Sequence, residues 1–160
     1  MTGFKEIQTN YPYFIATRNG DVAIGGGNTL KIMPFNYELT DNGSDYSTTT
    51  YKFTAPVKGL YQFNVGLSII NNNITGADEA DDSHTWGFRK NHEMTGATFY
   101  QLADNWGNRT NNASQLSRGF SISVPMNSND TMCVFYDEKE DFEVLMSESI
   151  FSGHLVKEFI

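Results

Sequence analysis

The chain has 160 residues, a net charge of −8, and a composition that is 39% hydrophobic and 14% aromatic. This length and apolar content predict one domain that buries a core without a metal or a disulfide, and Cys133 is the only cysteine. Because no cluster of Lys and Arg offsets the 19 acidic residues, and no apolar run approaches the length of a membrane span, we expect neither nucleic-acid binding nor membrane insertion.

Residues 1–12 show no consistent hydrophobic period and are interpreted as an N-terminal arm, followed by a single domain over residues 13–160. The arm carries Phe4, Ile7 and Tyr11 among polar residues, which is more apolar than a flexible tail needs. We therefore expect these three side chains to contact a partner. The N-terminus has no apolar signal segment, which predicts a protein that stays in the cell that makes it.

The first part of the domain shows short strand patterns separated by turn signals. Tyr13–Ala16 is a predicted strand, and Val22–Ile24 is a candidate to pair back on it. Leu30–Leu39 alternates and predicts another strand, and Ser47–Thr54 is rich in β-branched residues, which also favours a strand. The turn residues of Asp41–Asp45 separate these two segments.

A long strand is predicted after a sharp corner at Pro56–Gly59. Proline fixes its own φ, and Gly59 can adopt backbone conformations that are closed to other residues. Apolar side chains then occupy every second position, which is the period of a strand with one buried face. These side chains are Tyr61, Phe63, Val65, Leu67 and Ile69.

Two polar stretches, Asn71–Asp82 and Asn105–Ser114, are predicted to be exposed loops. The acidic run at the end of the first could attract calcium, but its spacing does not match the twelve-residue calcium loop, so a solvated loop is the favoured interpretation. Between the loops, Thr85–Lys90 and Thr98–Leu102 are predicted strands.

The remaining predicted strands are Phe120–Val124, closed by Pro125, then Thr131–Tyr136, Phe142–Met146 and Ile150–Val156. The Thr131–Tyr136 segment is almost continuously apolar, which predicts a strand covered on both faces and, together with exposed aromatic residues, an interface. No segment shows a 3.6-residue period with helix caps. The pattern therefore predicts an all-β sandwich or jelly roll with little or no helix.

Residue patterns for catalysis or metal binding are absent from the sequence. His84, His92 and His154 are far apart and have no ligand spacing, and no Gly-x-Ser-x-Gly motif occurs. Paired carboxylates occur only in predicted loops, where water would keep their pKa values near normal. We therefore predict a protein that is not an enzyme and needs no cofactor or metal.

Two segments resemble a known family. Lys52–Phe63 (KFTAPVKGLYQF) is similar to the signature of the complement C1q-like globular domains, relatives of the tumour necrosis factor (TNF) jelly roll, and Ser149–Leu155 (SIFSGHL) is similar to their closing strand. The resemblance runs from about Tyr13 to the C-terminus. It departs from the family at Asn71–Asp82 and Ala103–Asn112, which are longer and more polar than expected. It implies a C1q/TNF-like jelly-roll β-sandwich.

The resemblance also implies assembly as a tight homotrimer, around a threefold axis that is lined by aromatic and aliphatic side chains. The sequence does not decide whether a given apolar side chain lies in the core of one protomer or on that axis. The candidates for core or axis are Tyr61, Phe63, Phe135, Phe151 and Leu155.

Two functions from different classes fit such a trimer. The first is a structural protein of a bacteriophage virion, made in the host cytoplasm, that decorates or cements the capsid by contacts with the major capsid protein. Some phage cement proteins have a similar trimeric jelly roll, and the size and arm of this chain fit that role. A third hypothesis is a soluble ligand that resembles the secreted C1q-like cytokines. The sequence does not show the collagen stalk and signal segment that such a ligand is expected to carry.

The second function is the receptor-binding tip of a phage tail fibre. Its long polar loops would recognise a glycan or protein of the host surface, and aromatic side chains would stack on sugar rings. The candidate ligand contacts are Trp86, Tyr100 and Trp106.

Overall fold

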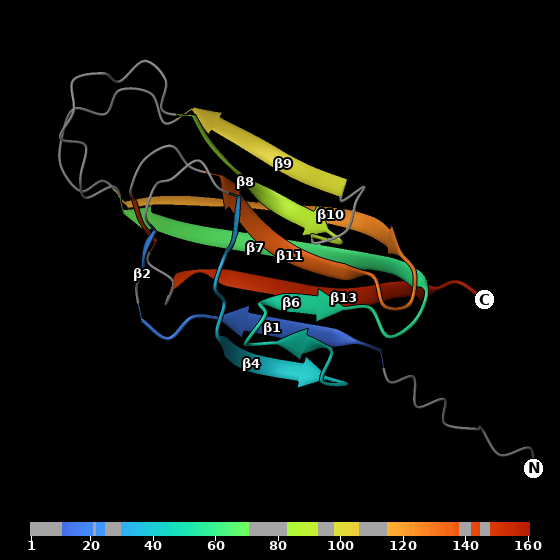
Figure 1. Cartoon of the computed structure of the whole chain (residues 1–160). Coiled ribbons are helices and arrows are strands. Elements are labelled where there is room, and N and C mark those ends of the chain that lie inside the picture. The colour runs from blue at the N-terminus through green and yellow to red at the C-terminus, as the bar shows by residue number, and fades with distance from the viewer. Residues whose placement is uncertain are drawn as a thin grey trace, which may run out of the picture.

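The computed structural model describes residues 11–20, 22–24, 30–70, 83–92, 98–105, 115–137, 142–144 and 148–160. These residues form a sandwich of two antiparallel β-sheets, called sheet A and sheet B (Figure 1). The first and last strands of the chain, β1 and β13, pair directly in sheet A. The predicted all-β sandwich is therefore confirmed.

Sheet A contains, in order, β4 (Tyr37–Asn42), β1 (Tyr13–Thr17), β13 (Ile150–Glu158), β7 (Gly59–Ile70) and β10 (Gln115–Met126). Two short strands extend this sheet: β12 (Phe142–Val144) pairs with the end of β7, and β2 (Val22–Ile24) pairs with β12. Sheet B runs in the order β5 (Tyr46–Ser47), β6 (Lys52–Thr54), β11 (Thr131–Asp137), β8 (Ser83–Lys90) and β9 (Thr98–Asn105), with β3 (Lys31–Ile32) also paired with β11. Pairing between strands that are distant in sequence dominates both sheets.

The long strand β7 lies between β13 and β10 at the centre of sheet A. Its side chains Tyr61, Phe63, Val65 and Leu67 are buried in the core, while the intervening Gln62 is only half-buried. The predicted two-residue period is confirmed from Tyr61 to Leu67, whereas Ser68 on the opposite face is also buried and the side chain of Ile69 lies outside the described part of the chain. Because the strand has one apolar and one polar face, its register determines which side of sheet A faces the core.

The corner before β7 needs a glycine for space rather than for backbone conformation. Gly59 is not among the residues with a positive φ, so the sequence-based reason for this glycine was wrong. A Cβ at this position would lie 2.5 Å from Leu155 Cδ1 and 2.6 Å from the carbonyl oxygen of Lys157. The close approach of β13 therefore excludes any side chain. The Tyr61 hydroxyl donates a hydrogen bond of 2.8 Å to the Val57 carbonyl, which holds the corner against β7.

The core between the sheets is a cluster of aromatic rings around Phe151. This side chain has no exposed surface, and its ring centroid lies 4.8 to 6.3 Å from those of other buried aromatic residues. These neighbours are Phe14, Phe35, Tyr46, Phe63 and Phe88. A Cβ at Gly153 would lie 2.6 Å from Phe63 Cδ1 and 2.8 Å from Phe14 Cε1, so this glycine lets both rings contact the β13 backbone.

Four predictions about individual strands are wrong. Ser47–Thr54 is not one strand, because a turn at residues 48–51, in which Tyr51 has a φ of 60°, divides it between β5 and β6. Leu30–Leu39 is divided into β3 and β4 around Met33–Asn36, because Pro34 has no N–H to continue a ladder. The strand β10 continues through Pro125, which was predicted to end it; β10 is at the edge of sheet A, where a proline is tolerated. Val22–Ile24 is a strand, but it pairs with β12 rather than with β1.

The strand β11 is buried on both of its faces within one protomer. Met132, Val134 and Tyr136 face the aromatic core, and Cys133 and Phe135 on the other face are at most 1% exposed. The prediction of a strand covered on both faces is confirmed. The interface that was inferred from this strand is corrected, since the protomer itself covers both faces and leaves nothing for another copy to contact.

The Asp130 carboxylate links the turn between β10 and β11 to the end of β8. Asp130 Oδ2 lies 2.7 Å from Lys90 Nζ and accepts a hydrogen bond from the Asn127 N–H, while Oδ1 accepts one from Asn91 Nδ2. Burial by itself would raise the pKa of the Asp130 carboxyl. The hydrogen bonds from Lys90, Asn91 and Asn127 outweigh burial and hold this pKa below its ordinary value of 3.8.

We expect Asp130→Asn to lower the free energy of unfolding by about 1–3 kcal/mol at neutral pH, because charge-assisted hydrogen bonds are lost. The folded pKa of Asp130 is lower than its unfolded pKa. Its contribution is therefore present above the unfolded value and disappears as the pH falls through the folded value. Urea unfolding at a series of pH values should show a shallower loss of stability below about pH 5 in the variant. Glu38→Gln, at an exposed carboxylate of β4, should follow the wild type; identical profiles for Asp130→Asn and wild type would contradict this assignment.

Candidate interaction surface

The outward side of sheet A, here called the outer face, carries the side chains that alternate with core residues along β1, β13, β7 and β10. The strand register places these side chains in rows across the sheet. The two central rows contain Tyr13, His154, Gln62 and Ser123 in one and Ile15, Ser152, Asn64 and Ser121 in the other. The outer face is therefore apolar toward β1 and polar toward β10.

The polar half of the outer face lies on β7 and β10, and its side chains bond to one another. Ser121 Oγ donates to Asn64 Oδ1 at 2.7 Å, and Ser123 Oγ donates to Gln62 Oε1. Asn64 Nδ2 donates to Ser152 Oγ on β13 at 3.4 Å. Because these groups satisfy part of their hydrogen bonding within the protomer, covering them with another protein costs less than covering isolated polar groups.

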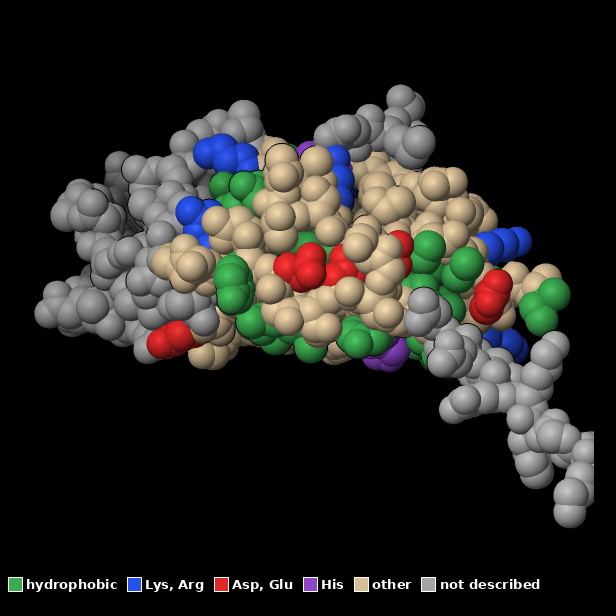
Figure 2. Space-filling view, turned by 90° about the horizontal axis from the view of Figure 1, so that it is seen from below, with side chains coloured by type: hydrophobic (Ala, Val, Ile, Leu, Met, Phe, Trp, Pro, Cys, Tyr) green, Lys and Arg blue, Asp and Glu red, His purple; other side chains and the backbone are tan. Residues whose placement is uncertain are grey.

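The apolar half of the outer face lies on β4, β1 and β13, and we call Tyr13, Ile15, Tyr37 and Ile150 the apolar strip. Tyr37 and Ile150 are opposite Thr17 on its two sides, and Tyr13, Tyr37 and Ile150 are 42%, 49% and 40% exposed. Figure 2 shows hydrophobic side chains gathered along the lower edge of the molecule in that view. Exposed apolar side chains that gather on one face of a protein mark contact sites. The apolar strip is therefore the candidate contact surface of sheet A.

The five side chains predicted for the core or a threefold axis all lie inside the protomer. Tyr61, Phe63, Phe135 and Phe151 have no exposed surface, and Leu155 is 6% exposed. Sequence reasoning missed the apolar strip, although a signal was present. Tyr13–Ala16 is apolar at every position rather than at every second one, which indicates a strand with two apolar faces.

Two of the three aromatic ligand candidates lie on strands rather than on loops. Trp86, on β8, is 3% exposed, and its ring centroid lies 5.3 Å from that of Phe120. A side chain packed in this way cannot stack on a sugar, so Trp86 is corrected to a core residue. Tyr100, on β9, is partly buried against the core. Trp106 lies outside the described residues, as does Asn71–Asp82 with its acidic run.

The arm candidates lie at the N-terminal end of the described chain or outside it. Phe4 and Ile7 are outside the described residues. Tyr11 is 49% exposed, and its carbonyl oxygen accepts a hydrogen bond of 3.0 Å from Asn42 Nδ2. Pro12 is buried, and its carbonyl oxygen accepts a bond of 2.9 Å from β13. The junction between the predicted arm and the domain is therefore held on sheet A.

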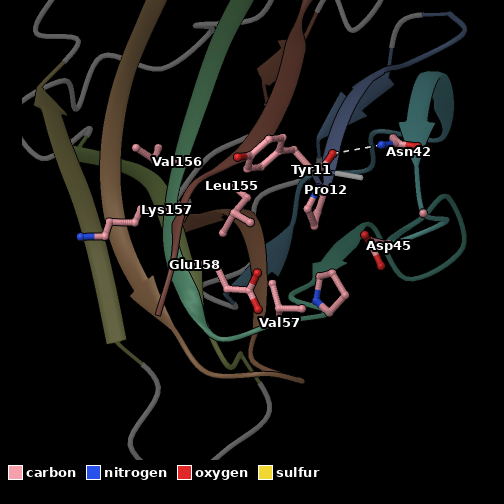
Figure 3. Close-up of a pocket in the computed structure, with 11 residues that line it drawn as sticks. Tyr11, Pro12, Asn42, Asp45, Val57, Leu155, Val156, Lys157 and Glu158 are labelled. Atoms are coloured by element: carbon pink, nitrogen blue, oxygen red, sulfur yellow. Dashed lines mark hydrogen bonds between the residues drawn. The ribbon is translucent and has the colours of Figure 1, made fainter. Parts of the chain in front are cut away.

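A cavity of about 610 Å³, here called the terminal pocket, opens beside this junction (Figure 3). Its walls come from the junction, the turn between β4 and β5, the corner before β7 and the end of β13. Pro12, Val57 and Leu155 supply apolar surface, and Asp45 and Glu158 supply carboxylates. The pocket therefore combines an apolar wall with negative charge at one end of the sandwich.

No group of three His, Cys, Asp or Glu side chains in the part of the chain that the structure describes is close enough to hold a metal ion. None of the described segments is a helix of the length and hydropathy that a membrane span requires. The features available for function in these residues are the apolar strip, the polar rows beside it and the terminal pocket.

A two-sheet jelly roll whose first and last strands pair, with an exposed apolar strip on one sheet, defines a β-sandwich interaction domain. The family model for the C1q domain matches residues 13–156. The chain belongs to the C1q domain family.

Solved structures share this fold at low sequence identity. The globular domain of zebrafish complement 1qA protein is 15% identical, with a TM-score of 0.65 over 93% of this chain and 99% of that chain. Eiger TNF from S. frugiperda is 14% identical, with a TM-score of 0.68 over 94% of each chain. Murine APRIL at pH 5.0 is 6% identical, with a TM-score of 0.64 over 91% of this chain and 99% of that chain. A search of curated protein sequences finds no match.

Proposed function

We propose that the protein is a homotrimeric, non-enzymatic structural protein of a bacteriophage virion, which decorates the capsid through contacts with the major capsid protein. Membership of the C1q domain family supports the trimer, because assembly around a threefold axis is typical of that family. The exposed apolar strip of sheet A is the observation that carries the self-association. The similar trimeric jelly roll of some phage cement proteins and the apolar residues of the predicted arm support the virion location.

The two halves of the outer face suit a threefold assembly. Contacts around a threefold axis are heterologous, so each protomer offers two different surfaces to its neighbours. The apolar strip on β4, β1 and β13 is one such surface, and the hydrogen-bonded rows on β7 and β10 are the other. A trimer built from these faces would bury well over the roughly 1,600 Å² of a standard interface.

The attachment to the capsid is assigned to the arm. Phe4 and Ile7 are too few to fold alone, and ordering the arm costs about 1–2 kcal/mol of backbone entropy per residue, which contacts with a partner must offset. Three arms on one trimer would act together through their high effective concentration. Three weak contacts would then give firm attachment.

Deleting residues 1–10 is expected to leave the trimer intact and to weaken its binding to capsids at least about 100-fold, because cooperation between the arms is lost. The deletion stops before Tyr11, whose carbonyl bonds Asn42. Co-sedimentation with capsids that lack the native protein measures the effect. The variant Phe4→Ser/Ile7→Ser keeps the arm length and separates side-chain contacts from tethering.

Undiminished binding of the truncated trimer would remove the arm from the attachment mechanism. Failure of the full-length trimer to bind capsids, together with binding to host cells, would instead favour the receptor-binding tip of a tail fibre. The oligomeric state is measured separately by light scattering, so neither of these results bears on the proposed trimer.

A further inference from the structure

Two carboxylates at the terminal pocket have no cationic partner in the residues that the structure describes. Asp45 lies at the end of the turn between β4 and β5, and Glu158 ends β13, and Figure 3 shows both at the cavity. Neither forms an ion pair or a side-chain hydrogen bond with another described residue. Lys157 belongs to the same wall, but its side chain points away from the cavity in Figure 3.

The negative field of this pocket also acts on the groups around it. Burial and the neighbouring charge of Asp41 both raise the pKa of Asp45. Burial raises the pKa of Tyr61, and the charges of Asp45 and Glu158 raise it further. The two carboxylates therefore both act on Tyr61, beside the corner before β7, and neither of them is in an ion pair with a described residue.

The apolar wall beside these charges suits a side chain that combines a hydrocarbon stem with a cationic head. Pro12, Val57 and Leu155 line the cavity, which is partly open to solvent. Arginine and lysine bury their methylene stems on apolar surface and keep a charged end for acceptors. Arginine in addition matches carboxylates with a planar array of donors.

We infer that the terminal pocket binds an arginine or lysine side chain of a partner protein, with its stem against Val57 and Leu155 and its cationic head between Asp45 and Glu158. The net charge of −8 favours approach of a basic surface. The inference goes beyond the proposed function, because it concerns one pocket of the protomer and holds for any location of the trimer.

The test uses the full chain and two small probes that differ only in charge. N-acetyl-L-arginine amide is expected to shift the methyl NMR signals of Val57 and Leu155 saturably, with a dissociation constant of about 1–10 mM, as weak exposed ion pairs allow. N-acetyl-L-citrulline amide, its neutral isostere, is expected to produce no saturable shift. Asp45→Asn and Glu158→Gln should each weaken arginine binding by about threefold to tenfold. The control Glu38→Gln removes the same charge from β4 and should change nothing.

The absence of a saturable shift, an equal response to citrulline, or an equal loss of binding in Glu38→Gln would overturn the inference. If Lys5→Gln shifted the same methyl signals without a probe, the occupant would be the protein's own Lys5, and a partner side chain would be ruled out. Light scattering on every variant reports the trimer separately. Failure of the pocket to bind is therefore distinguishable from failure of the proposed assembly.

Discussion

Replacing Phe151 with alanine is expected to lower the free energy of unfolding by about 4–5 kcal/mol, the upper part of the range for a buried phenylalanine. The Phe151 ring has no exposed surface and contacts aromatic rings from both sheets. Truncation would leave a cavity that these rings cannot fill, because Gly153 already brings Phe63 and Phe14 against the β13 backbone. Thermal and urea unfolding at one fixed protein concentration measure the change, since the stability of an oligomer depends on concentration.

Phe159→Ala is the matched control for this truncation. It removes the same ring near the same end of the chain, at a position that is 39% exposed. Its cost should stay below about 1 kcal/mol, because little buried surface is lost. A melting temperature for Phe151→Ala within a degree or two of the wild type would show that this ring is not the centre of the core.

Introducing a charge into the apolar strip is expected to break the proposed trimer. Ile150→Glu places a carboxylate on the outer face, where Ile150 is 40% exposed and alternates with the core residue Phe151. If this face is buried in a trimer, each unpaired carboxylate costs several kcal/mol, and the dissociation constant rises by at least about 100-fold. The core is untouched, so the protomer should remain folded and appear in light scattering as an 18.0 kDa species.

Thr54→Glu is the control for the added charge, because Thr54 is exposed on β6 in the other sheet. This variant should remain a trimer. Trimers of unchanged affinity in Ile150→Glu would move the contact surface away from the apolar strip. A wild-type protein that is monomeric at micromolar concentration would contradict the trimer itself.

Much of the β-sheet pattern could be predicted from the sequence because a strand repeats every two residues. The alternation from Tyr61 to Leu67 predicted the buried face of β7, and the family motifs predicted a C1q/TNF-like fold, to which the match over residues 13–156 assigns the chain. The sequence did not identify the reason for a residue that could serve more than one structural role. Gly59 was expected to serve a special φ, but the approach of Leu155 and Lys157 is the reason for it.

The candidate sites depended more heavily on the tertiary structure. Trp86 was assigned to a ligand loop, although its two-residue spacing from Phe88 also fits a core position, and both side chains are buried. The two apolar faces of Tyr13–Ala16 could be read from the sequence only as an apolar run. The register with β13 and β4 places the side chains of Tyr13 and Ile15 on the outer face of sheet A.

The sequence by itself determined the alternation of side chains, the corner before β7 and the shortage of catalytic motifs, because these are properties of neighbouring residues. Only the tertiary structure decided which apolar residues remain exposed and which carboxylates come together. Asp45 and Glu158 are more than a hundred positions apart in the chain, and the terminal pocket exists because β13 pairs with both β1 and β7. Such long-range pairing is set by the packing of whole sheets around a core, which no local pattern encodes.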